Sequence, residues 1–428
     1  MTGAAGRRGA IPAGRPDAAL LAAGTGLLAA SLQFAGALKS LPGVAVLPID
    51  LTVLAALLLL PSLGLLLLVR DWAIAPVVAG PLLAAALLLA WLVLAGGWTA
   101  SRLVGAEKLP QLMLLAPEML LAGLLVGADA PSLRRLSATV VAIGLLVGAA
   151  TAWGLASGNV VLGGAVGQDP AKLRVQYQLA GLAIACAAGL AALRVVERRG
   201  WRRLGWAVAT LALGAAVLLP GGRAALLGLG LGVAGAPAAL LWLSGRRGAA
   251  LGWVALVGAA GLGGLAALVA LPGIDLGLRT LERLLGDPAS ATPARLILWG
   301  EALRWAGEAA PWGLGTGGFT LAAGSGDGRA LHPHNHALEA LAEAGLPGLA
   351  LWLAAFGGGV ALAIRQAPRV APGRAARIAA LTLPLGLTAM VSTDLGNRMV
   401  WFGLGLLLSL AVEARSRVLP QAGGQRNV

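Results

Sequence analysis

The sequence contains few of the residues that a soluble protein displays on its surface. Only 12% of its 428 residues are charged, it has a single cysteine, and its three histidines stand close together. With Cys186 alone, the chain can form neither an internal disulfide framework nor a thiolate metal site. The sequence also lacks the alternation of polar and apolar residues that is typical of membrane β-barrel strands. These absences favour a helical protein that is mostly apolar.

Long uncharged apolar runs fill most of the chain. Hydrophobic residues account for 58% of it, and runs of about 20 residues, the length needed to cross roughly 30 Å of hydrocarbon, recur along it. We therefore predict an all-α, polytopic integral membrane protein with about twelve transmembrane helices and a large outer loop. The predicted spans are 18–38, 50–69, 73–96, 109–127, 136–157, 175–193, 204–220, 222–243, 249–271, 336–364, 377–393 and 398–413.

The distribution of charge predicts the orientation of these spans. If the N-terminus is cytoplasmic, twenty of the 32 lysines and arginines lie in cytoplasmic segments, whereas only five of the 18 acidic residues do. This bias follows the positive-inside rule, so we expect both termini in the cytoplasm. The cations are spread over many short loops, which argues against a nucleic-acid-binding surface.

One segment interrupts the succession of spans. We divide the chain into nine spans within 1–271, an outer loop at 272–335, three spans within 336–413 and a cytoplasmic tail at 414–428. A loop as long as 272–335 is usually functional or disordered. An amphipathic helical pattern inside it favours function.

The helical pattern of the outer loop has recognisable ends. Thr292 suits the N-cap, Pro293 suits the first turn, and Pro311 ends the pattern. We expect one apolar side made of Leu296, Trp299, Leu303 and Ala306. A Gly-rich stretch, 313–318, follows the helix, and its backbone could come close to a ligand.

All three histidines lie where the outer loop re-enters the membrane, in HPHNHALEALAEAGLPG at 332–348. Asn335 is suited to cap the tenth span, and Glu339 and Glu343 lie one turn apart on it. An imidazole with a pKa near 6.5 can act as a base at neutral pH. Three interpretations compete: a base or substrate contact, a loop-capping role, and a metal site built from His332, His334 and His336.

Two arginines at predicted element ends are candidate binding residues. Arg223 stands at the otherwise apolar end of a span, where an ionisable group is a functional candidate and snorkelling to the interface is the alternative. Arg295 opens the loop helix, where a cation opposes the helix dipole. A bound anion would explain its position, and a surface salt bridge is the alternative.

Two stretches of the outer loop resemble a known signature. RLILWGEALRWAGEAAPWGLGTGGF and, after a short gap, HPHNHALEALAEAGLPG resemble the O-antigen ligase and O-antigen polymerase superfamily, which are glycosyltransferases of the bacterial envelope. The resemblance implies a bacterial inner-membrane protein with a large periplasmic loop before a His-Asn motif. It implies that His334 is catalytic and that Asn335 contacts substrate.

The resemblance extends to arginines that hold a lipid diphosphate. LPGGRAALLGL is similar to the motif that supplies one of them, which places it at Arg223. Arg174, in LRVQYQLAG, occupies a similar outer position, although this chain has Gln176 and Gln178 where the superfamily often has Asn. We add Arg295 to this substrate-binding set.

The implied reaction moves a glycan from undecaprenyl diphosphate to a sugar hydroxyl, of lipid A-core or a similar glycan, on the periplasmic face. It inverts the anomeric carbon and needs a base and positive charge but no metal or other cofactor. The expected partners are this donor, the acceptor and the lipid bilayer, and no nucleic acid. A polymerase with the same donor or a protein-glycosylating relative remains open. A secondary transporter, which would show matching halves with broken spans, is the alternative of another class.

Overall fold

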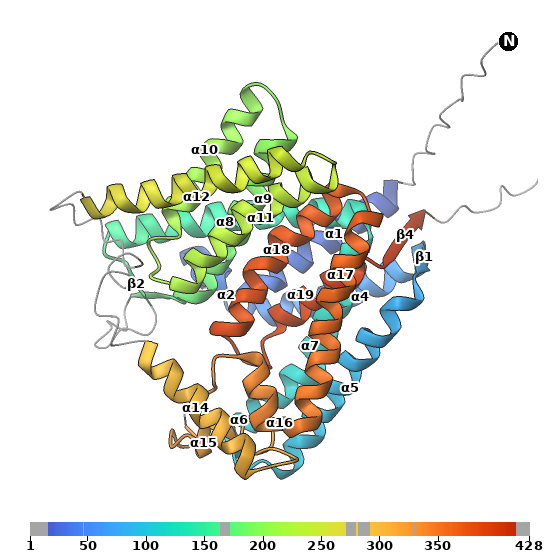
Figure 1. Cartoon of the computed structure of the whole chain (residues 1–428), viewed down its shortest axis with the longest axis vertical. Helices are drawn as coiled ribbons and strands as arrows, with labels where there is room; N and C mark the ends of the chain where they lie inside the picture. The colour runs from blue at the N-terminus through green and yellow to red at the C-terminus, as the bar shows by residue number, and fades with distance from the viewer. Residues whose placement is uncertain are drawn as a thin grey trace, which may run out of the picture.

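The fold of the chain is known from a computed structural model that describes residues 16–45, 47–162, 172–270, 280, 292–328 and 330–416. These residues are almost entirely helical and form a bundle with a smaller cap of helices at one end (Figure 1). The main helices are α1 (Pro16–Gln33), α2 (Ala35–Leu38), α3 (Pro42–Ala45), α4 (Leu51–Val69), α5 (Ala79–Ala95), α6 (Arg102–Pro110), α7 (Ala116–Ala128), α8 (Ala130–Ala156), α9 (Tyr177–Glu197), α10 (Trp201–Ala216), α11 (Arg223–Leu243), α12 (Arg247–Ala270), α14 (Thr292–Glu308), α15 (Phe319–Ala322), α16 (His336–Trp352), α17 (Gly358–Gln366), α18 (Pro372–Val391) and α19 (Arg398–Ser409).

Short turns of other helical types join or extend these helices. They are η1 (Pro76–Val78), η2 (Gly96–Trp98), η3 (Gln111–Leu115), η5 (Leu353–Gly357) and η6 (Ala367–Arg369). The strands are β1 (Arg70–Ile74), β2 (Val160–Leu162), β3 (Leu173–Val175) and β4 (Val412–Ser416). The predicted all-α class is therefore confirmed.

Every predicted span coincides with a helix. Nine stretches of the described residues are long and apolar enough to cross a membrane, which confirms a polytopic membrane protein. The three other predicted spans coincide with the shorter helices α1, α10 and α19, of 18, 16 and 12 residues. The boundaries of the four predicted domains stay a prediction.

Small residues let the central helices approach closely. A Cβ atom built on Gly123 of α7 would lie 2.2 Å from the carbonyl oxygen of Phe402 in α19, and one on Gly405 would lie 2.2 Å from that of Leu120. Glycine at such places allows the backbone contact on which membrane helices rely. Cys186 is fully buried in the middle of α9. This burial gives Cys186 a packing role.

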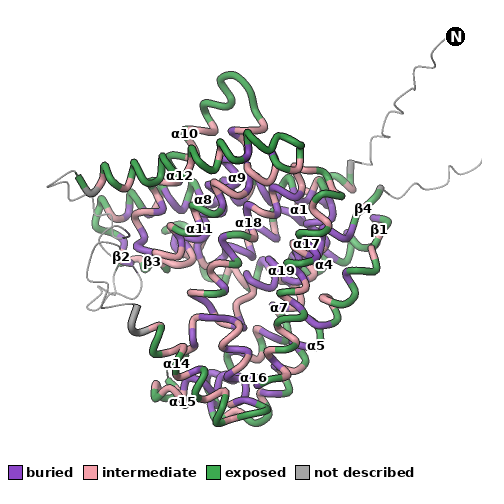
Figure 2. The backbone as a smooth tube through the Cα atoms, in the orientation of Figure 1, coloured by how far each residue is buried: buried purple, intermediate pink, exposed green. Residues whose placement is uncertain are grey.

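The outer helices of the bundle expose their apolar side chains. Figure 2 shows α10 and α12 as largely exposed, whereas α9, α18 and α19 run through the buried interior. In α12, no part of the apolar window is buried inside the protein. A helix that is apolar all round and unburied is expected to face lipid.

Two short sheets join segments that the charge pattern assigns to the same side of the membrane. β1, which follows α4, pairs antiparallel with β4, which follows α19 (Figure 1). β2 and β3 pair in parallel within the predicted outer segment between α8 and α9. Near β1, Arg70 forms a buried ion pair with Asp129 at 3.0 Å. Pairing of β1 with β4 agrees with an even number of crossings between them.

We predict that the segment between α12 and α16 is periplasmic. A reporter that is active only in the periplasm should be active when fused after Gly326 and inactive when fused after Arg202, because basic residues concentrate on the predicted cytoplasmic side. The complementary cytoplasmic reporter should give the reverse pattern. A cytoplasmic result at Gly326 would contradict the orientation.

Candidate functional site

The helix of the outer loop forms as predicted but buries a different side. α14 spans Thr292–Glu308 and packs beside α16 at the capped end (Figure 1). Leu296 and Leu303 of the predicted apolar side are more than half exposed, so that side is not the one that packs against the protein. Ala302 is instead fully buried and clusters with Phe319 of α15 and Ala342 of α16. Leu298 packs against this cluster, and Trp299 and Trp305 donate to the carbonyl oxygens of Pro333 and Ala322, so the packed side combines small and large residues.

The glycine-rich stretch after α14 approaches protein backbone. Gly313, Gly315 and Gly317 all have positive φ, between 80° and 85°, which is a region that only glycine enters readily. A Cβ atom on Gly315 would lie 2.6 Å from the Cα atom of Thr99, beyond α5. The contacts of these glycines with neighbouring helices explain the stretch without a ligand.

The glycine-rich stretch binds to α16 at a break in that helix. Gly345, with φ of 67°, interrupts the helix, and the carbonyl oxygens of the preceding turn are therefore available. Leu314 and Gly315 donate their backbone N–H groups to the carbonyl oxygens of Ala342 and Glu343, at 2.9 and 2.8 Å. The outer loop is thus joined to the first half of α16 by main-chain hydrogen bonds.

A buried ion cluster holds α6 against the same half-helix. Lys108 Nζ lies 2.6 Å from Glu339 Oε1 and 3.0 Å from Glu343 Oε2, and all three side chains are almost completely buried. The backbone N–H of Gly317 donates to Glu343 at 2.8 Å, and that of Leu395 donates to Glu339 at 3.1 Å. The two carboxylates therefore bind the outer loop and the segment between α18 and α19 to α16. Neither carboxylate is accessible to a substrate.

Asn335 caps α16, as predicted. Its Oδ1 atom accepts a hydrogen bond from the backbone N–H of Leu338 at 3.1 Å. A role of Asn335 in substrate binding stays a prediction. His336, the first residue of the helix, is fully buried, with Nε2 2.6 Å from the carbonyl oxygen of Asp394 and Nδ1 3.5 Å from Nε1 of Trp352. These contacts make His336 a structural residue.

His334 differs from its two neighbours in backbone and in side chain. It is the non-glycine residue with positive φ, 56°, in the described part of the chain, and such strain is often found at functional sites. Its Nδ1 atom is buried without a hydrogen-bond partner among the described residues. Its ring packs edge-on against that of His332 with centroids 4.1 Å apart, and Trp299 of α14 donates to the carbonyl oxygen of Pro333 at 3.0 Å. A rigid segment thus presents an imidazole nitrogen with unused hydrogen-bonding capacity.

The charges around His334 favour its neutral form. Burial lowers the pKa of His334, and the nearby guanidinium of Arg295 lowers it further, whereas a hydrogen bond with the backbone of Ser392 and the carboxylate of Asp394 act in the opposite direction. Burial also lowers the pKa of His332, to about 3. Both imidazoles are therefore neutral at neutral pH, as a base must be.

The structure brings the two predicted diphosphate-binding arginines together. Burial lowers the pKa of Arg295, Tyr177 raises it, and the positive charge of Arg223 lowers it further. Arg295 therefore lies within electrostatic range of both Arg223 and His334, although these residues come from α14, α11 and the loop before α16. Arg295 forms no ion pair with the residues that the structure describes, so the salt-bridge alternative gains no support.

The third predicted arginine lies apart from this group. Arg174 is exposed on β3, and its charge does not contribute to the pKa shifts of His334 or Arg295. Its role in binding stays a prediction.

The sequence reasoning missed the segment between α18 and α19. Asp394 in this segment contacts His336 through its backbone and acts on His334 through its charge. A signal was available, since the stretch STDLGNR at 392–398 is polar between two apolar helices. Lys108 was missed as well, although an ionisable residue beside a span is a functional candidate by default.

The three histidines do not share one set of partners, as a metal site would require. The ring of His336 is held by the Asp394 carbonyl group and Trp352, and Nδ1 of His332 accepts the backbone N–H of His334 at 3.2 Å. Among the described residues, no group of three or more His, Cys, Asp or Glu side chains has the arrangement of a metal site. The geometry gives no support to the metal interpretation.

A comparison with protein families decides between the classes of function. Residues 207–353 match the family model of O-antigen ligase. This part of the chain is similar to O-antigen ligase. The family predicted from the sequence is confirmed, and the transporter alternative loses its support. No curated protein matches the chain.

The O-antigen ligase match covers most of the site described above. It runs from within α10 to just past the end of α16. It includes Arg223, Arg295 and His334, whereas Arg174, Lys108 and Asp394 lie outside it. The site therefore combines residues of the matched domain with residues that only the fold brings to it.

We predict that Lys108→Met strongly destabilises the protein. The substitution leaves Glu339 and Glu343 buried without their cation, and breaking a buried ion pair in this way costs about 3–5 kcal/mol. The midpoint of thermal unfolding in detergent should fall accordingly. Arg304→Met is the control, because Arg304 pairs with Glu301 and Glu308 on the exposed side of α14 and its loss should change the midpoint little. Equal midpoints for the two variants would contradict a structural role of the cluster.

We predict an acid limb of kcat/KM that lies below pH 6.5. The pKa of free His334 is lowered by burial and by Arg295, so the neutral base persists to a lower pH than an ordinary histidine allows, and activity falls only as pH drops through that lowered value. Arg295→Gln should move this limb to higher pH, because it removes the cation that disfavours protonation. Arg304→Gln on the same helix should leave the limb unchanged. A wild-type limb at or above pH 6.5 would refute the assignment.

Proposed function

We propose that the protein is an O-antigen ligase-like glycosyltransferase that moves a glycan from undecaprenyl diphosphate to a sugar hydroxyl, such as one of lipid A-core, on the periplasmic face of the inner membrane. His334 is the general base, and Arg223 and Arg295 bind the diphosphate. The reaction is a metal-independent displacement with inversion. The matched O-antigen ligase domain and the chemistry of this group of side chains support the proposal.

The unpartnered Nδ1 atom of His334 carries the proposal. A buried polar atom without a hydrogen bond costs free energy, and such an atom next to strained backbone is a reason to look for a substrate contact. A neutral imidazole nitrogen accepts the hydrogen bond of an incoming hydroxyl group. It then takes the proton as the hydroxyl oxygen attacks.

The displacement needs only a base and a place for the leaving charge. The acceptor oxygen forms a bond to the anomeric carbon while the bond from this carbon to the diphosphate oxygen breaks, so the configuration inverts. The proton of the hydroxyl passes to His334, and the electron pair leaves with undecaprenyl diphosphate. The diphosphate is already an activated leaving group, which leaves charge stabilisation as the main task of the protein.

The arginine pair suits a diphosphate because its two cations repel each other. Arg223 lowers the pKa of Arg295, which means that each charge disfavours the other. A dianionic group between them would turn this repulsion into two attractions, and guanidinium groups bind phosphate oxygens in bidentate fashion. The same anion would relieve the positive field of Arg295 at His334 as the imidazole takes up its proton.

Glycan transfer by purified protein tests this function. Wild type should transfer a glycan from undecaprenyl diphosphate to lipopolysaccharide that lacks O-antigen, and should do so equally in EDTA. His334→Ala should lower the rate by at least about 100-fold, the contribution of a general base. His332→Ala is the control, because its ring lies beside that of His334 but its Nδ1 atom is used by the backbone, and it should keep a substantial fraction of the rate.

Three results would overturn parts of the proposal. Full activity of His334→Ala would remove the histidine base, and loss of wild-type activity in EDTA would indicate a metal. Joining of donor glycans to one another, with no product on the lipopolysaccharide, would make the protein a polymerase.

A further inference from the structure

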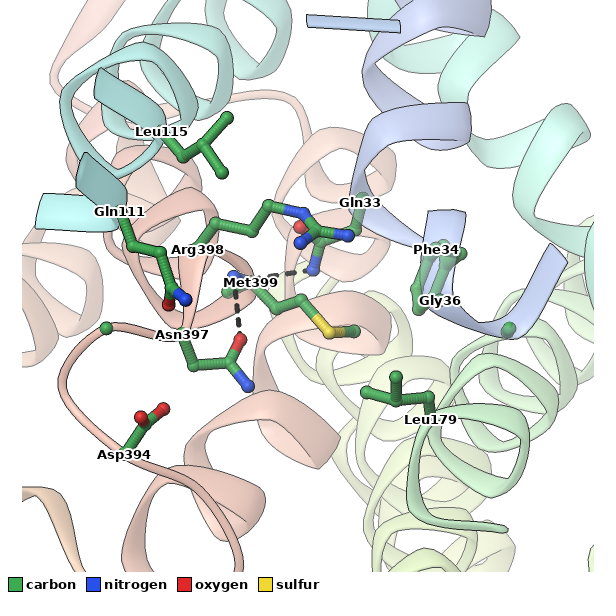
Figure 3. A pocket seen from close by; sticks show the side chains of 12 residues that line it. Gln33, Phe34, Gly36, Gln111, Leu115, Leu179, Asp394, Asn397, Arg398 and Met399 are labelled. Carbon is green, nitrogen blue, oxygen red and sulfur yellow. Dashed lines mark hydrogen bonds between the residues drawn. The ribbon is translucent and has the colours of Figure 1, made fainter. Parts of the chain in front are cut away.

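A polar pocket lies beside the histidines and belongs to none of the residues assigned so far to the diphosphate or to the base. It has a volume of about 200 Å³. Its walls come from the end of α1, from α2, from η3, from the start of α9 and from the segment between α18 and α19 (Figure 3). The lining polar side chains are Gln33, Gln111, Asp394, Asn397 and Arg398.

Several of these side chains are fixed by one hydrogen bond to the backbone. Arg398 donates through Nε to the carbonyl oxygen of Leu32 at 3.2 Å, and Asn397 accepts from the N–H of Met399 at 2.9 Å. In Figure 3, Arg398 extends across the pocket toward Gln33. The wall is therefore ordered before any ligand enters, which lowers the entropic cost of binding.

The side chain of Gln33 indicates that the pocket binds a polar ligand. Its side chain is 1% exposed, and its Nε2 atom donates to the carbonyl oxygen of Met399 at 3.4 Å. Its Oε1 atom is buried and has no hydrogen-bond partner among the described residues. Buried amide oxygens normally accept a hydrogen bond, so this atom indicates a missing donor.

The composition of the wall favours a neutral molecule with several hydroxyl groups. Amides of Gln33 and Gln111 offer both donors and acceptors, Asp394 offers acceptors and Arg398 offers donors. One carboxylate and one guanidinium leave the wall with no net formal charge. A phosphate would meet the carboxylate of Asp394 here. A sugar ring, with hydroxyl groups that both donate and accept, suits the pocket better.

The pocket adjoins the histidine segment of the proposed reaction centre. Asp394 lines it and acts on the pKa of His334. The carbonyl oxygen of Asp394 lies 2.6 Å from Nε2 of His336, two residues after His334, so a sugar in the pocket lies beside the histidine segment without occupying the base.

We infer that this pocket binds the sugar ring whose hydroxyl group attacks, the acceptor of the transfer. The inference rests on the proposed function. A donor sugar is joined directly to the diphosphate and must lie against the arginines, whereas the acceptor hydroxyl must reach the histidine. The pocket next to Asp394 is the place from which an acceptor meets that requirement.

Two variants change the pocket without touching the base or the arginines. Gln111→Leu removes an amide at nearly constant size. Gly396→Ala adds a methyl group whose carbon atom lies 2.8 Å from Gln111 Oε1 and 3.6 Å from Asp394 Oδ2, so it pushes a flexible side chain into the pocket. Gly43→Ala is the matched control, since a Cβ atom there meets nothing within 4 Å.

The test is steady-state glycan transfer with the acceptor and donor varied in turn. The acceptor is lipopolysaccharide that lacks O-antigen, and the donor is a glycan on undecaprenyl diphosphate. Both pocket variants should raise the KM for the acceptor about three- to tenfold, the effect of losing one hydrogen bond, with kcat and the KM for the donor close to wild type. The control variant should leave all three values unchanged.

The outcomes separate this inference from the proposed function. A rise in the KM for the donor alone would overturn the acceptor assignment, and unchanged values for both pocket variants would remove the pocket from the reaction. If wild type transfers no glycan, the proposed function itself fails. The midpoint of thermal unfolding identifies a variant that is misfolded, and the other pocket variant then decides.

Discussion

The site depends on one buried cation. Lys108 is held by Glu339 and Glu343 at 2.6 and 3.0 Å in an environment almost without solvent. Removing three charges from water is costly, and this cost is offset only if each remaining oxygen finds a donor. Two of the donors are backbone N–H groups of Gly317 and Leu395. Satisfying the charges therefore forces two loops, far apart in the sequence, to meet the start of α16.

This constraint explains how loops can form a precise site. The strained backbone of His334 lies two residues before α16, and Asp394 lies one residue before the N–H group that binds Glu339. Both residues are therefore positioned from the same buried cluster, one through the helix and one through the loop. Close packing of α7 against α19 adds to this, because the contacts at Gly123 and Gly405 fix the helix that follows Asp394. The ordinary mobility of loops is suppressed where it would separate the base from its surroundings.

The sequence predicts the parts of this structure that depend on local pattern. Hydrophobic length predicts the helices, the N-cap preference of Asn335 predicts the start of α16, and the spacing of the histidines marks the site. The packed side of α14 was not predictable in the same way. Leu296 and Leu303 follow helical periodicity but are exposed, whereas Ala302 is buried against Phe319 and Ala342. These contacts join separate elements, which the periodicity of one helix does not show. Periodicity shows which residues share a side of a helix, but not which side meets another element of the fold.

The charge interactions between residues far apart in the chain were also not predictable from the sequence. Nothing in the spacing of Arg223, Arg295 and His334 shows that their charges interact, because the three residues come from separate elements. Lys108 and Glu339, which pair in the fold, are 231 positions apart in the sequence. Taken alone, each residue is indistinguishable from other charged residues near the end of a span. Only the fold shows that one is a structural cation and the others a repelling pair. The sequence alone could therefore identify the chemical groups, but not which charges are already satisfied and which are available.

The different charges of the two regions also favour the proposed displacement, because each region suits a different substrate. The positive charge of Arg223 acts on Arg295, whereas the pocket at Gln33 and Arg398 balances its one cation with Asp394. A diphosphate is drawn to the first region and repelled at the carboxylate, while a neutral sugar has little preference on charge and is selected by hydrogen bonds. His334 is acted on by both Arg295 and Asp394, which places it between these two fields. As the proton moves onto the imidazole, the carboxylate stabilises the new cation, and the departing diphosphate neutralises the arginine that had opposed it. Both changes favour the forward displacement at the same moment, so the arrangement suits a single inverting step.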